Sequence, residues 1–469
     1  MTSFSIHNFG CRVNQAEAFS WSDDFQKGGL RFEVDPARSD LVIVNSCTLT
    51  GRADRDVRKF VRRIARENPG AKLVVTGCYA ERAYEEFRMM PQVWMVLKNS
   101  EKKDLAGNIL RALGGRGADG PAPASGPAGS ARTGASAASA GGHPPGGPVP
   151  RFSRAAGSGT EHFRSRAIIK VQDGCDFRCA FCIIPSVRGK SASRPRAAVL
   201  SEAREYARRG FHEIVLAGIH LCSYGLDFEP PQSLTGLLRD LEEINGGPRI
   251  RLSSLDPRFL DDAFIAFLTA GRTICPHFHL SLQSGSDRVL RAMGRPANRA
   301  RFQRILAGLR SGSPEAGLGA DIIVGFPGES DAEFASTYDF LAGSPLTYFH
   351  VFSFSPRAGT AAADMEPVGE KTKKARSAAL RKLSREKNLR FRRSLVGKDL
   401  DGIVIQKSDG GARILTSNYI DVRVPRCGPQ EREAVRLRIS EAEPGRTEGT
   451  IIDGSPGPSL SAFPPGGGG

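Results

Sequence analysis

Long hydrophobic runs are absent from this sequence of 469 residues. A helix that spans a bilayer needs about 20 consecutive apolar residues, and no segment approaches that length. Residues 1–14 contain neither the basic segment nor the apolar segment of a secretory signal peptide. We therefore expect no membrane contact and a cytoplasmic location.

Acidic residues are fewer than basic residues. The chain has 50 Asp and Glu against 66 Lys and Arg, which gives a net charge of +16 and favours a polyanionic partner. Hydrophobic residues make up 40% of the chain, a globular value that excludes wholesale disorder. At roughly 150 residues per domain, the length indicates about three domains.

Large apolar side chains are almost missing from residues 114–160, where 37 of 47 residues are Gly, Ala, Pro or Ser. Such a segment cannot bury enough surface to offset its ordering entropy, so we expect a flexible linker. Residues 456–469 have a similar composition and are expected to form a disordered tail. The predicted domains are then residues 1–113, 161–393 and 394–455.

Three cysteines follow three β-rich runs in the first predicted domain. The runs are residues 4–9, 40–44 and 72–76, each followed by a helix-like stretch. This alternation predicts a parallel sheet, in which the carboxyl ends of neighbouring strands share one edge. Cys11, Cys47 and Cys78 would then meet at that edge, unless three buried cysteines coincide with strand ends by chance. Three thiolates without a fourth ligand suit an iron–sulfur cluster with one open iron better than a closed zinc site.

The same alternation returns after the linker. Helix-like segments separate most of six β-rich runs, which are residues 167–171, 213–217, 249–253, 277–282, 321–324 and 348–354. Six such units are too few for a closed eight-stranded barrel, so we expect an α/β fold with an open partial barrel. Catalytic groups should then lie at the carboxyl ends of its strands.

Three cysteines with the spacing C-x3-C-x2-C, namely Cys175, Cys179 and Cys182, follow the first of these strands. A loop of this spacing lets three thiolates bind three corners of a cubane cluster and leaves the fourth iron free for a substrate or cofactor. A zinc site is the main alternative. Zinc needs a fourth Cys or His nearby, and the next one, His212, lies 30 residues beyond Cys182.

With an aromatic residue, Phe181, before its last cysteine, this motif resembles the signature of the radical S-adenosylmethionine enzymes. The N-terminal cysteines and the C-terminal segment narrow the resemblance to the methylthiotransferases, over residues 1–113 and about 161–455. The resemblance implies a Rossmann-like N-terminal domain, a partial (β/α)6 barrel and a small C-terminal β-barrel of the TRAM type. It also implies two 4Fe-4S clusters, one on each set of three cysteines. S-adenosylmethionine would bind the open iron of the cluster on Cys175, Cys179 and Cys182.

Three segments are most similar to the family branch that acts on N6-threonylcarbamoyladenosine beside the tRNA anticodon. They are residues 10–15 (GCRVNQ), 216–221 (LAGIHL) and 279–286 (HLSLQSGS). Two features depart from that branch: Phe177 and Arg178 reverse the usual order before the second cysteine, and Cys222 stands where glycine is usual.

This branch implies a function, which is the addition of a methylthio group to C2 of the adenine at position 37. The implied partners are the tRNA anticodon loop, an electron donor such as a flavodoxin or ferredoxin, and a sulfur donor. Three alternatives remain open. The substrate could be isopentenyladenosine or a ribosomal protein, or the chain could be a non-catalytic iron–sulfur protein that binds RNA.

Glycines and short polar residues at predicted strand ends are candidate contacts for the cofactor. Together with Phe181, the candidates are Gly218, Ser253, Gln283, Ser284, Asp321 and Gly325. Glycine and serine also simply form turns, which is the alternative for each of these positions. The remaining cysteines match no ligand pattern and are expected to be core or incidental, namely Cys222, Cys275 and Cys427.

A strongly basic segment follows the last predicted strand of the barrel. Residues 371–394 contain eleven Lys or Arg and one acid, with leucines on a plausible apolar face. The solvated face of an amphipathic helix is the plain interpretation, but the charge density favours RNA contact. The candidate RNA-binding residues are Lys373, Lys374, Arg381 and Lys382. Four short strands are predicted in the TRAM-like module, at residues 403–406, 413–415, 420–424 and 435–439.

Overall fold

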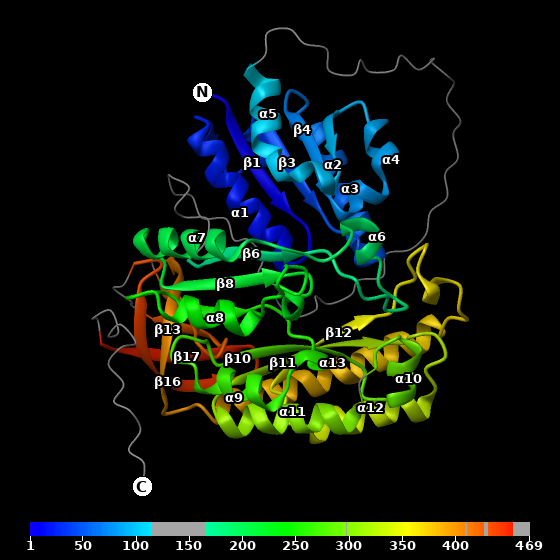
Figure 1. Ribbon diagram of the computed structural model, residues 1–469, viewed down its shortest axis with the longest axis vertical. Coiled ribbons are helices and arrows are strands. Elements are labelled where there is room, and N and C mark those ends of the chain that lie inside the picture. Colours follow the sequence, from blue (N-terminus) through cyan, green and yellow to red (C-terminus); the bar gives the residue numbers. More distant parts are fainter. Residues whose placement is uncertain (115–164, 297, 409, 426–429, 454–469) are drawn as a thin grey trace.

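A parallel sheet of five strands, in the order β2-β1-β3-β4-β5, forms the first part of the computed structural model (Figure 1). The strands are β1 (Ser3–Asn8), β2 (Arg31–Phe32), β3 (Leu41–Ser46), β4 (Lys72–Gly77) and β5 (Val93–Leu97). The helices are α1 (Arg12–Lys27), α2 (Gly51–Glu67), α3 (Cys78–Arg82), α4 (Tyr84–Arg88) and α5 (Leu105–Gly114). Helices α1 and α5 pack on one face of the sheet, whereas α2, α3 and α4 pack on the other.

The structure describes residues 1–114, 165–296, 298–408, 410–425 and 430–453. The predicted tail and all but the first residue of the predicted linker lie outside these ranges. Within the described ranges, no helix combines the length and the apolar character needed to cross a membrane.

Six parallel strands form the partial barrel that the sequence predicts, and a short antiparallel strand, β7, extends it. Its two sheets have the orders β7-β6-β8-β9 and β10-β11-β12. The strands are β6 (Ala167–Asp173), β7 (Ala192–Ser193), β8 (Glu213–Gly218), β9 (Arg249–Leu252), β10 (His277–Gln283), β11 (Gly317–Val324) and β12 (Tyr348–Ser353). The isolated bridges Ile250 to Ile274 and Leu255 to Leu280 join the two sheets on one side. Among the described strands, β12 pairs with neither β6 nor β7, so the barrel is open on the other side.

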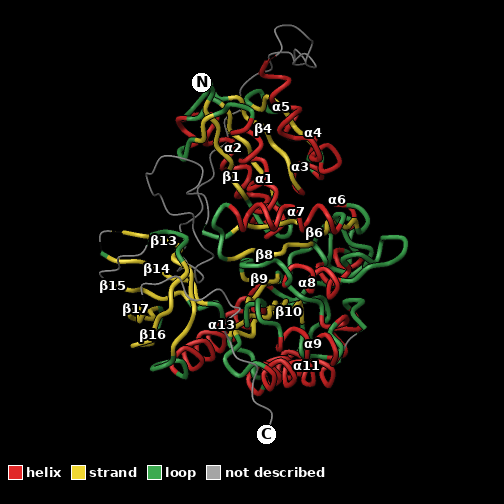
Figure 2. The backbone as a smooth tube through the Cα atoms, turned by 60° about the vertical axis from the view of Figure 1, so that its left-hand side comes forward, coloured by secondary structure: helices red, strands yellow, loops and turns green. Residues whose placement is uncertain are grey.

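Eight helices accompany these strands. They are α6 (Ile184–Arg188), α7 (Arg196–Arg208), α8 (Leu234–Glu242), α9 (Asp262–Ala270), α10 (Asp287–Ala292), α11 (Arg299–Gly312), α12 (Asp331–Gly343) and α13 (Glu370–Arg393). The last of them, α13, runs along the edge strand β12 toward the C-terminal strands (Figure 2). Its Ser384 hydroxyl bonds both the N–H and the C=O of Phe349 at 2.9 Å, which satisfies backbone groups of that edge.

Helix α1 is buried on two sides and joins the first sheet to the barrel. On one side Trp21 and Phe25 pack into the core of the first sheet. On the other, Val13 and Ala16 pack against β6 and β8, and Phe19 enters the core of the barrel. A helix that is apolar on both sides buries each side against a different layer, so the two parts share this element.

The C-terminal strands form a closed barrel in the order β13-β14-β15-β17-β16. They are β13 (Asp399–Ser408), β14 (Gly411–Thr416), β15 (Asp421–Pro425), β16 (Ala434–Glu443) and β17 (Arg446–Asp453). The TRAM-like barrel is therefore confirmed, with one more strand than the sequence predicted. Strand β17 escapes prediction because its buried side carries Thr447 and Gly449 instead of large apolar residues.

A buried ion pair docks this small barrel onto the partial barrel. Glu213 is fully buried and accepts bonds from Arg251 Nε at 2.6 Å and Nη2 at 2.9 Å. Arg251 also donates to the backbone carbonyls of Thr416 and Ser417, at 3.2 and 3.0 Å. Although burial alone would raise the pKa of Glu213, Arg251 and its neighbours hold it well below its usual range.

We expect the substitution Arg251→Met to destabilise the fold by about 3–5 kcal/mol, since it removes the main partner of a buried carboxylate. The measurement is the free energy of unfolding in urea. As a matched control, Arg208→Met removes an exposed ion pair with Glu205 and should cost about 0–1 kcal/mol. Equal losses in the two variants would contradict the assigned role of Arg251.

Candidate functional site

The first set of site cysteines, called here the loop triad, lies on the loop after β6. It consists of Cys175, Cys179 and Cys182. The loop begins at Gly174, whose φ is +69° and whose added Cβ would lie 1.9 Å from the carbonyl oxygen of Lys190. The loop is also tied to the barrel where the N–H of Ala180 donates to the C=O of Met293 at 3.0 Å. At position 174 only glycine permits the close approach to the Lys190 backbone that shapes this loop.

A cationic network adjoins the loop triad. The buried carboxylate of Asp256 accepts bonds from Arg258 and Arg295 at 2.7 and 2.9 Å, and His220 Nε2 lies 3.2 Å away. Arg295 Nη1 donates to the Sγ atom of Cys179 at 3.7 Å. Although burial alone would raise the pKa of Asp256, its bonds with His220 and Arg258 hold it well below its usual range. One carboxylate thus orients two guanidinium groups and directs positive charge toward a thiol.

The two departures from the family pattern both contact this network. The Phe177 ring lies 4.9 Å from the ring of His220, and the guanidinium of Arg258 lies 4.0 Å from the Phe177 ring centre. The Cys222 sulfur accepts a hydrogen bond from the N–H of Asp256 at 3.3 Å. Both residues therefore have structural roles beside the loop triad.

The second set, called here the sheet triad, lies at the carboxyl edge of the first sheet. It consists of Cys11, Cys47 and Cys78, which follow β1, β3 and β4. An added Cβ on Gly10 would lie 2.7 Å from the Sγ atom of Cys47, so only glycine permits this approach. Asn14 Nδ2 donates to the carbonyls of Phe9 and Ser46 at 2.9 and 3.0 Å and ties two of these loops together.

Buried charges surround the sheet triad. Glu17 pairs with Lys102, Lys170 and Arg188 at 2.8, 3.2 and 3.1 Å. Asp173 pairs with Lys170 and Arg188 at 3.0 and 2.8 Å. Although burial alone would raise the pKa of Glu17, these three cations hold it well below its usual range. Three cations against two carboxylates leave surplus positive charge, which an anionic group nearby can neutralise.

Helix α6 connects the two triads. It begins two residues after Cys182 and ends at Arg188, whose Nε donates to the Sγ atom of Cys78 at 3.1 Å. One apolar cluster contacts cysteines of both triads; it contains Cys78, Ile183, Ile184 and Val187, with Cys175, Cys182 and Ile219 packed against it. The fold therefore brings cysteines of the two triads to the two ends of one short helix.

The chemistry of both triads fits iron–sulfur clusters. Metal binding requires thiolates, and burial raises the pKa of Cys47 and of Cys182 to about 12. Such thiols ionise only beside strong positive charge, which a cluster iron provides. In each triad one thiol, Cys78 or Cys179, also accepts a bond from a buried arginine, which favours an anionic cluster.

Several of the predicted cofactor contacts lie near the loop triad or at strand ends. The N–H of Gly218 donates to the Ser253 hydroxyl at 3.4 Å, so these two strand ends are adjacent. Gln283 ends β10 after a register shift and has a φ of +72°, a strained conformation for this residue. Phe181 packs with Phe326 and other apolar side chains beside the loop triad.

The other three candidates have surroundings that do not point to the cofactor. Asp321 lies within β11, paired in register with His350, and is not at a strand end. The Ser284 hydroxyl lies 3.2 Å from the Thr337 hydroxyl of α12, so helix packing explains its burial. Gly325 adjoins the side chain of Lys373. The structure therefore does not bring all seven candidates into one group.

Among the predicted RNA-binding residues, the structure presents Lys374, Arg381 and Lys382 to solvent. Lys373 is only 5% exposed, and its Nζ pairs with Glu370. The prediction for Lys373 is therefore wrong, because this side chain lies on the buried face of α13, seven residues before the buried Leu380.

Sequence reasoning missed the charged residues that surround both triads, above all Asp256, Arg295, Glu17 and Arg188. No spacing marks them, since their partners lie far away along the chain. It also missed the polar side chains inside the partial barrel. These did leave a signal: His277 and His279 alternate with apolar residues along β10, as Tyr348 and His350 do along β12.

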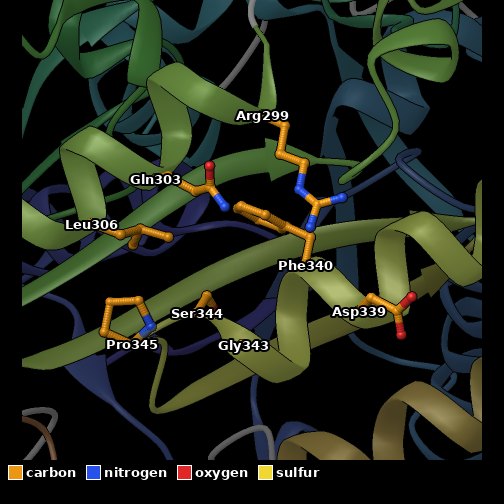
Figure 3. A pocket seen from close by; sticks show the side chains of 8 residues that line it. All are labelled: Arg299, Gln303, Leu306, Asp339, Phe340, Gly343, Ser344 and Pro345. Atoms are coloured by element: carbon orange, nitrogen blue, oxygen red, sulfur yellow. The ribbon is translucent and has the colours of Figure 1, made fainter.

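The pocket in Figure 3 is separate from both triads. It lies between α11 and α12 on the outside of the barrel, and its lining residues are Arg299, Gln303, Leu306, Asp339, Phe340, Gly343, Ser344 and Pro345. None of these is a cysteine or a strand-end residue. Cys275 is buried as predicted, and Cys427 lies outside the described residues.

Comparisons with known proteins agree with this geometry. The Radical SAM superfamily matches residues 169–341, and a family described as "Uncharacterized protein family UPF0004" matches residues 3–97. The threonylcarbamoyladenosine tRNA methylthiotransferase MtaB of Thermotoga maritima is 35% identical, with 85% of this chain and 86% of the relative covered. The proteins of that name from Aquifex aeolicus and Bacillus subtilis are 32% and 33% identical and cover 89% and 78% of this chain, and 96% and 76% of the relatives.

Among solved structures, the radical S-adenosylmethionine methyltransferase TsrM from Kitasatospora setae matches with a TM-score of 0.53 and 15% identity. The match covers 77% of this chain and 74% of TsrM. At this identity the likeness shows a shared fold and nothing about substrate. The methylthiotransferases named above are 32–35% identical to this chain over 76–96% of their own length. This similarity shows the family as well as the fold: the chain belongs to the methylthiotransferase family of radical S-adenosylmethionine enzymes.

Proposed function

We propose that this chain adds a methylthio group to C2 of N6-threonylcarbamoyladenosine at position 37 of tRNA. The observation that carries the proposal is that α6 connects two cysteine triads, with Cys182 near its first residue and Cys78 bonded to its last. The curated relatives with this substrate in their name match most of the chain, which supports the choice of substrate. An iron–sulfur cluster and S-adenosylmethionine are cofactors of the radical SAM fold, and the count of two clusters is part of the proposal.

Replacing an aromatic C–H bond by C–S needs a hydrogen-atom abstractor that side chains cannot supply. When bound, a cluster on the loop triad would supply the electron that cleaves S-adenosylmethionine to such an abstractor, and a cluster on the sheet triad would supply or carry the sulfur, which would take its methyl group from a second S-adenosylmethionine.

The residues of this chain hold and shield these groups. Arg295 and Arg188 each place a guanidinium against one thiol, which stabilises negative charge on the ligands. The apolar side chains of Ile183, Val187 and Ile219 pack against cysteines of both triads and exclude water there. Exclusion of water protects a reactive intermediate from side reactions.

We assign RNA binding to α13 and the C-terminal barrel within the predicted domains, residues 161–393 and 394–455. Lys371, Lys374, Arg381 and Arg385 are exposed and follow one stripe of α13. An anticodon loop suits such a surface because its bases can be splayed outward without melting a duplex. An electron donor of the flavodoxin or ferredoxin class and a sulfur donor complete the proposed reaction, in the cytoplasm.

The first test is the product. We expect stem–loop RNA carrying N6-threonylcarbamoyladenosine to gain a methylthio group when incubated with the reconstituted protein, S-adenosylmethionine, sulfide and a reductant, as measured by nucleoside mass spectrometry. The matched control is Cys179→Ala, which should form no product. Modification of stem–loops carrying isopentenyladenosine instead would contradict the proposed substrate.

The second test is the count of clusters. Two separate triads imply about eight irons per chain, falling to about four when either triad is replaced by alanine. Iron and acid-labile sulfide are measured in anaerobically purified protein. The variant Cys275→Ala removes a buried thiol outside the triads and should keep all of the iron. A fully reconstituted chain with only four irons would contradict the two-cluster proposal.

The third test is RNA affinity. Replacing Lys371, Lys374, Arg381 and Arg385 by Gln should weaken binding and flatten the salt dependence of log K by about 0.7–0.9 for each phosphate that is no longer neutralised. The measurement is tRNA affinity across a salt series.

Replacing Lys59, Arg62 and Arg66, which are exposed on α2, provides the comparison and should change the slope little. An unchanged slope in the α13 variant together with a reduced slope in the α2 variant would transfer the RNA site to α2.

A further inference from the structure

The interior of the partial barrel contains a row of polar rings. His277 Nε2 lies 2.7 Å from the Tyr348 hydroxyl, and the His279 ring lies 5.1 Å from the ring of His350. The carboxylate of Asp321 lies 3.6 Å from His279 and 3.3 Å from His350. Two buried ring nitrogens in this row make no hydrogen bond: His277 Nδ1, and His279 Nε2, which is the atom that lies 3.6 Å from Asp321 Oδ1. Buried polar atoms without partners indicate a place where a ligand can bind.

Arg12 reaches this row from the first sheet. Its Nη2 donates to the Tyr419 hydroxyl at 2.6 Å, and the Tyr419 ring stacks on His277 at 4.2 Å. Arg12 directly follows Cys11 of the sheet triad, so it lies between that triad and the polar row. Within the described residues no carboxylate pairs with Arg12, in contrast to Arg251, which is held by Glu213.

The surroundings of Arg12 carry surplus positive charge. Arg166, Arg249 and Arg251 share a single carboxylate, that of Glu213. Burial alone would raise the pKa of Tyr419, but the neighbouring guanidiniums lower it, which is the sign expected where positive potential dominates. A bound anion would neutralise this potential.

A cation fits the site beside Arg12 and His279 less well than an anion does. The ligand atoms of His279, Asp321 and His350 all lie within 4.8 Å of one another, a spacing that a divalent metal ion could use. Burial lowers the pKa of His279 and the Asp321 carboxylate raises it, whereas His350 and the Arg12 guanidinium lower it, so positive charge on the Arg12 side of the row opposes a cation. The geometry and the charge together favour an anionic ligand.

We propose that Arg12, positioned by Tyr419, binds the carboxylate of the threonylcarbamoyl group, and that His279 Nε2 hydrogen-bonds the same substituent. This inference rests on the proposed function and names the residues that select its substrate. The substituent is attached at N6, and one ring atom separates C6 from C2 in adenine. An anchor beside Cys11 therefore holds C2 near the sheet triad, where sulfur is to be added.

The test compares two stem–loop RNAs, one with the natural threonine carboxylate and one with threoninamide in its place. The wild-type protein should show a kcat/KM about 10- to 100-fold lower for the amide, the loss expected for one charge-assisted hydrogen bond. Arg12→Gln should lose a similar factor on the carboxylate substrate and show no preference between the two RNAs. Arg12→Lys should recover part of that preference.

Two further variants make the outcome specific. Tyr419 lies in the C-terminal barrel, far along the chain from any cysteine of the triads. The substitution Tyr419→Phe should therefore reduce the preference for the carboxylate substrate without loss of iron. Arg272→Gln removes an exposed arginine and should behave as the wild type.

The failures of the two proposals are distinguishable. A wild-type protein that modifies neither RNA contradicts the proposed function, and this inference with it. A wild-type protein that modifies both RNAs equally, or an Arg12→Gln variant that keeps the preference, overturns the inference alone.

Discussion

The position of the two triads relative to each other depends on one buried guanidinium, that of Arg188, whose side chain is 1% exposed. Its three nitrogens bond the Cys78 thiol, the carboxylates of Glu17 and Asp173, and the Asn14 side chain. These partners come from α3, β6 and α1, whereas Arg188 itself ends α6. A planar group with a fixed fork of donors sets the angles as well as the distances among its partners. The first sheet is therefore docked on the barrel in one orientation.

Both triads use the same electrostatic device although they arise from unrelated segments. At the loop triad Asp256 orients Arg295 toward Cys179, and at the sheet triad Glu17 orients Arg188 toward Cys78. Burying a guanidinium is costly, and a carboxylate partner offsets that cost only when the remaining donors are also satisfied. For both arginines, the last hydrogen-bond acceptor is a cysteine sulfur. The charge of each network is therefore balanced only when that sulfur belongs to a thiolate or an anionic cluster.

The features that the sequence predicts are those with local signals. Alternating apolar runs predict the first sheet and the partial barrel, and the spacing from Cys175 to Cys182 predicts the loop triad because all three ligands lie on one short segment. The three cationic partners of Glu17 lie 85, 153 and 171 residues away, so no window of sequence can pair them. Lys373 is a different case. Its place on the stripe of Leu380 and Ser377 could be read from helical periodicity, but the charge count of the whole segment outweighed that pattern.

The shortness of α6 has a mechanical consequence. Its five residues are anchored at one end by the loop that carries Cys182 and at the other by the contact of Arg188 with Cys78. Lengthening the gap between the triads would require this helix to unwind or Arg188 to lose its ion pairs with the buried Glu17 and the half-buried Asp173. The two triads are therefore held at a fixed separation. Under the proposed function, the nucleotide or S-adenosylmethionine would therefore have to move between two fixed sites.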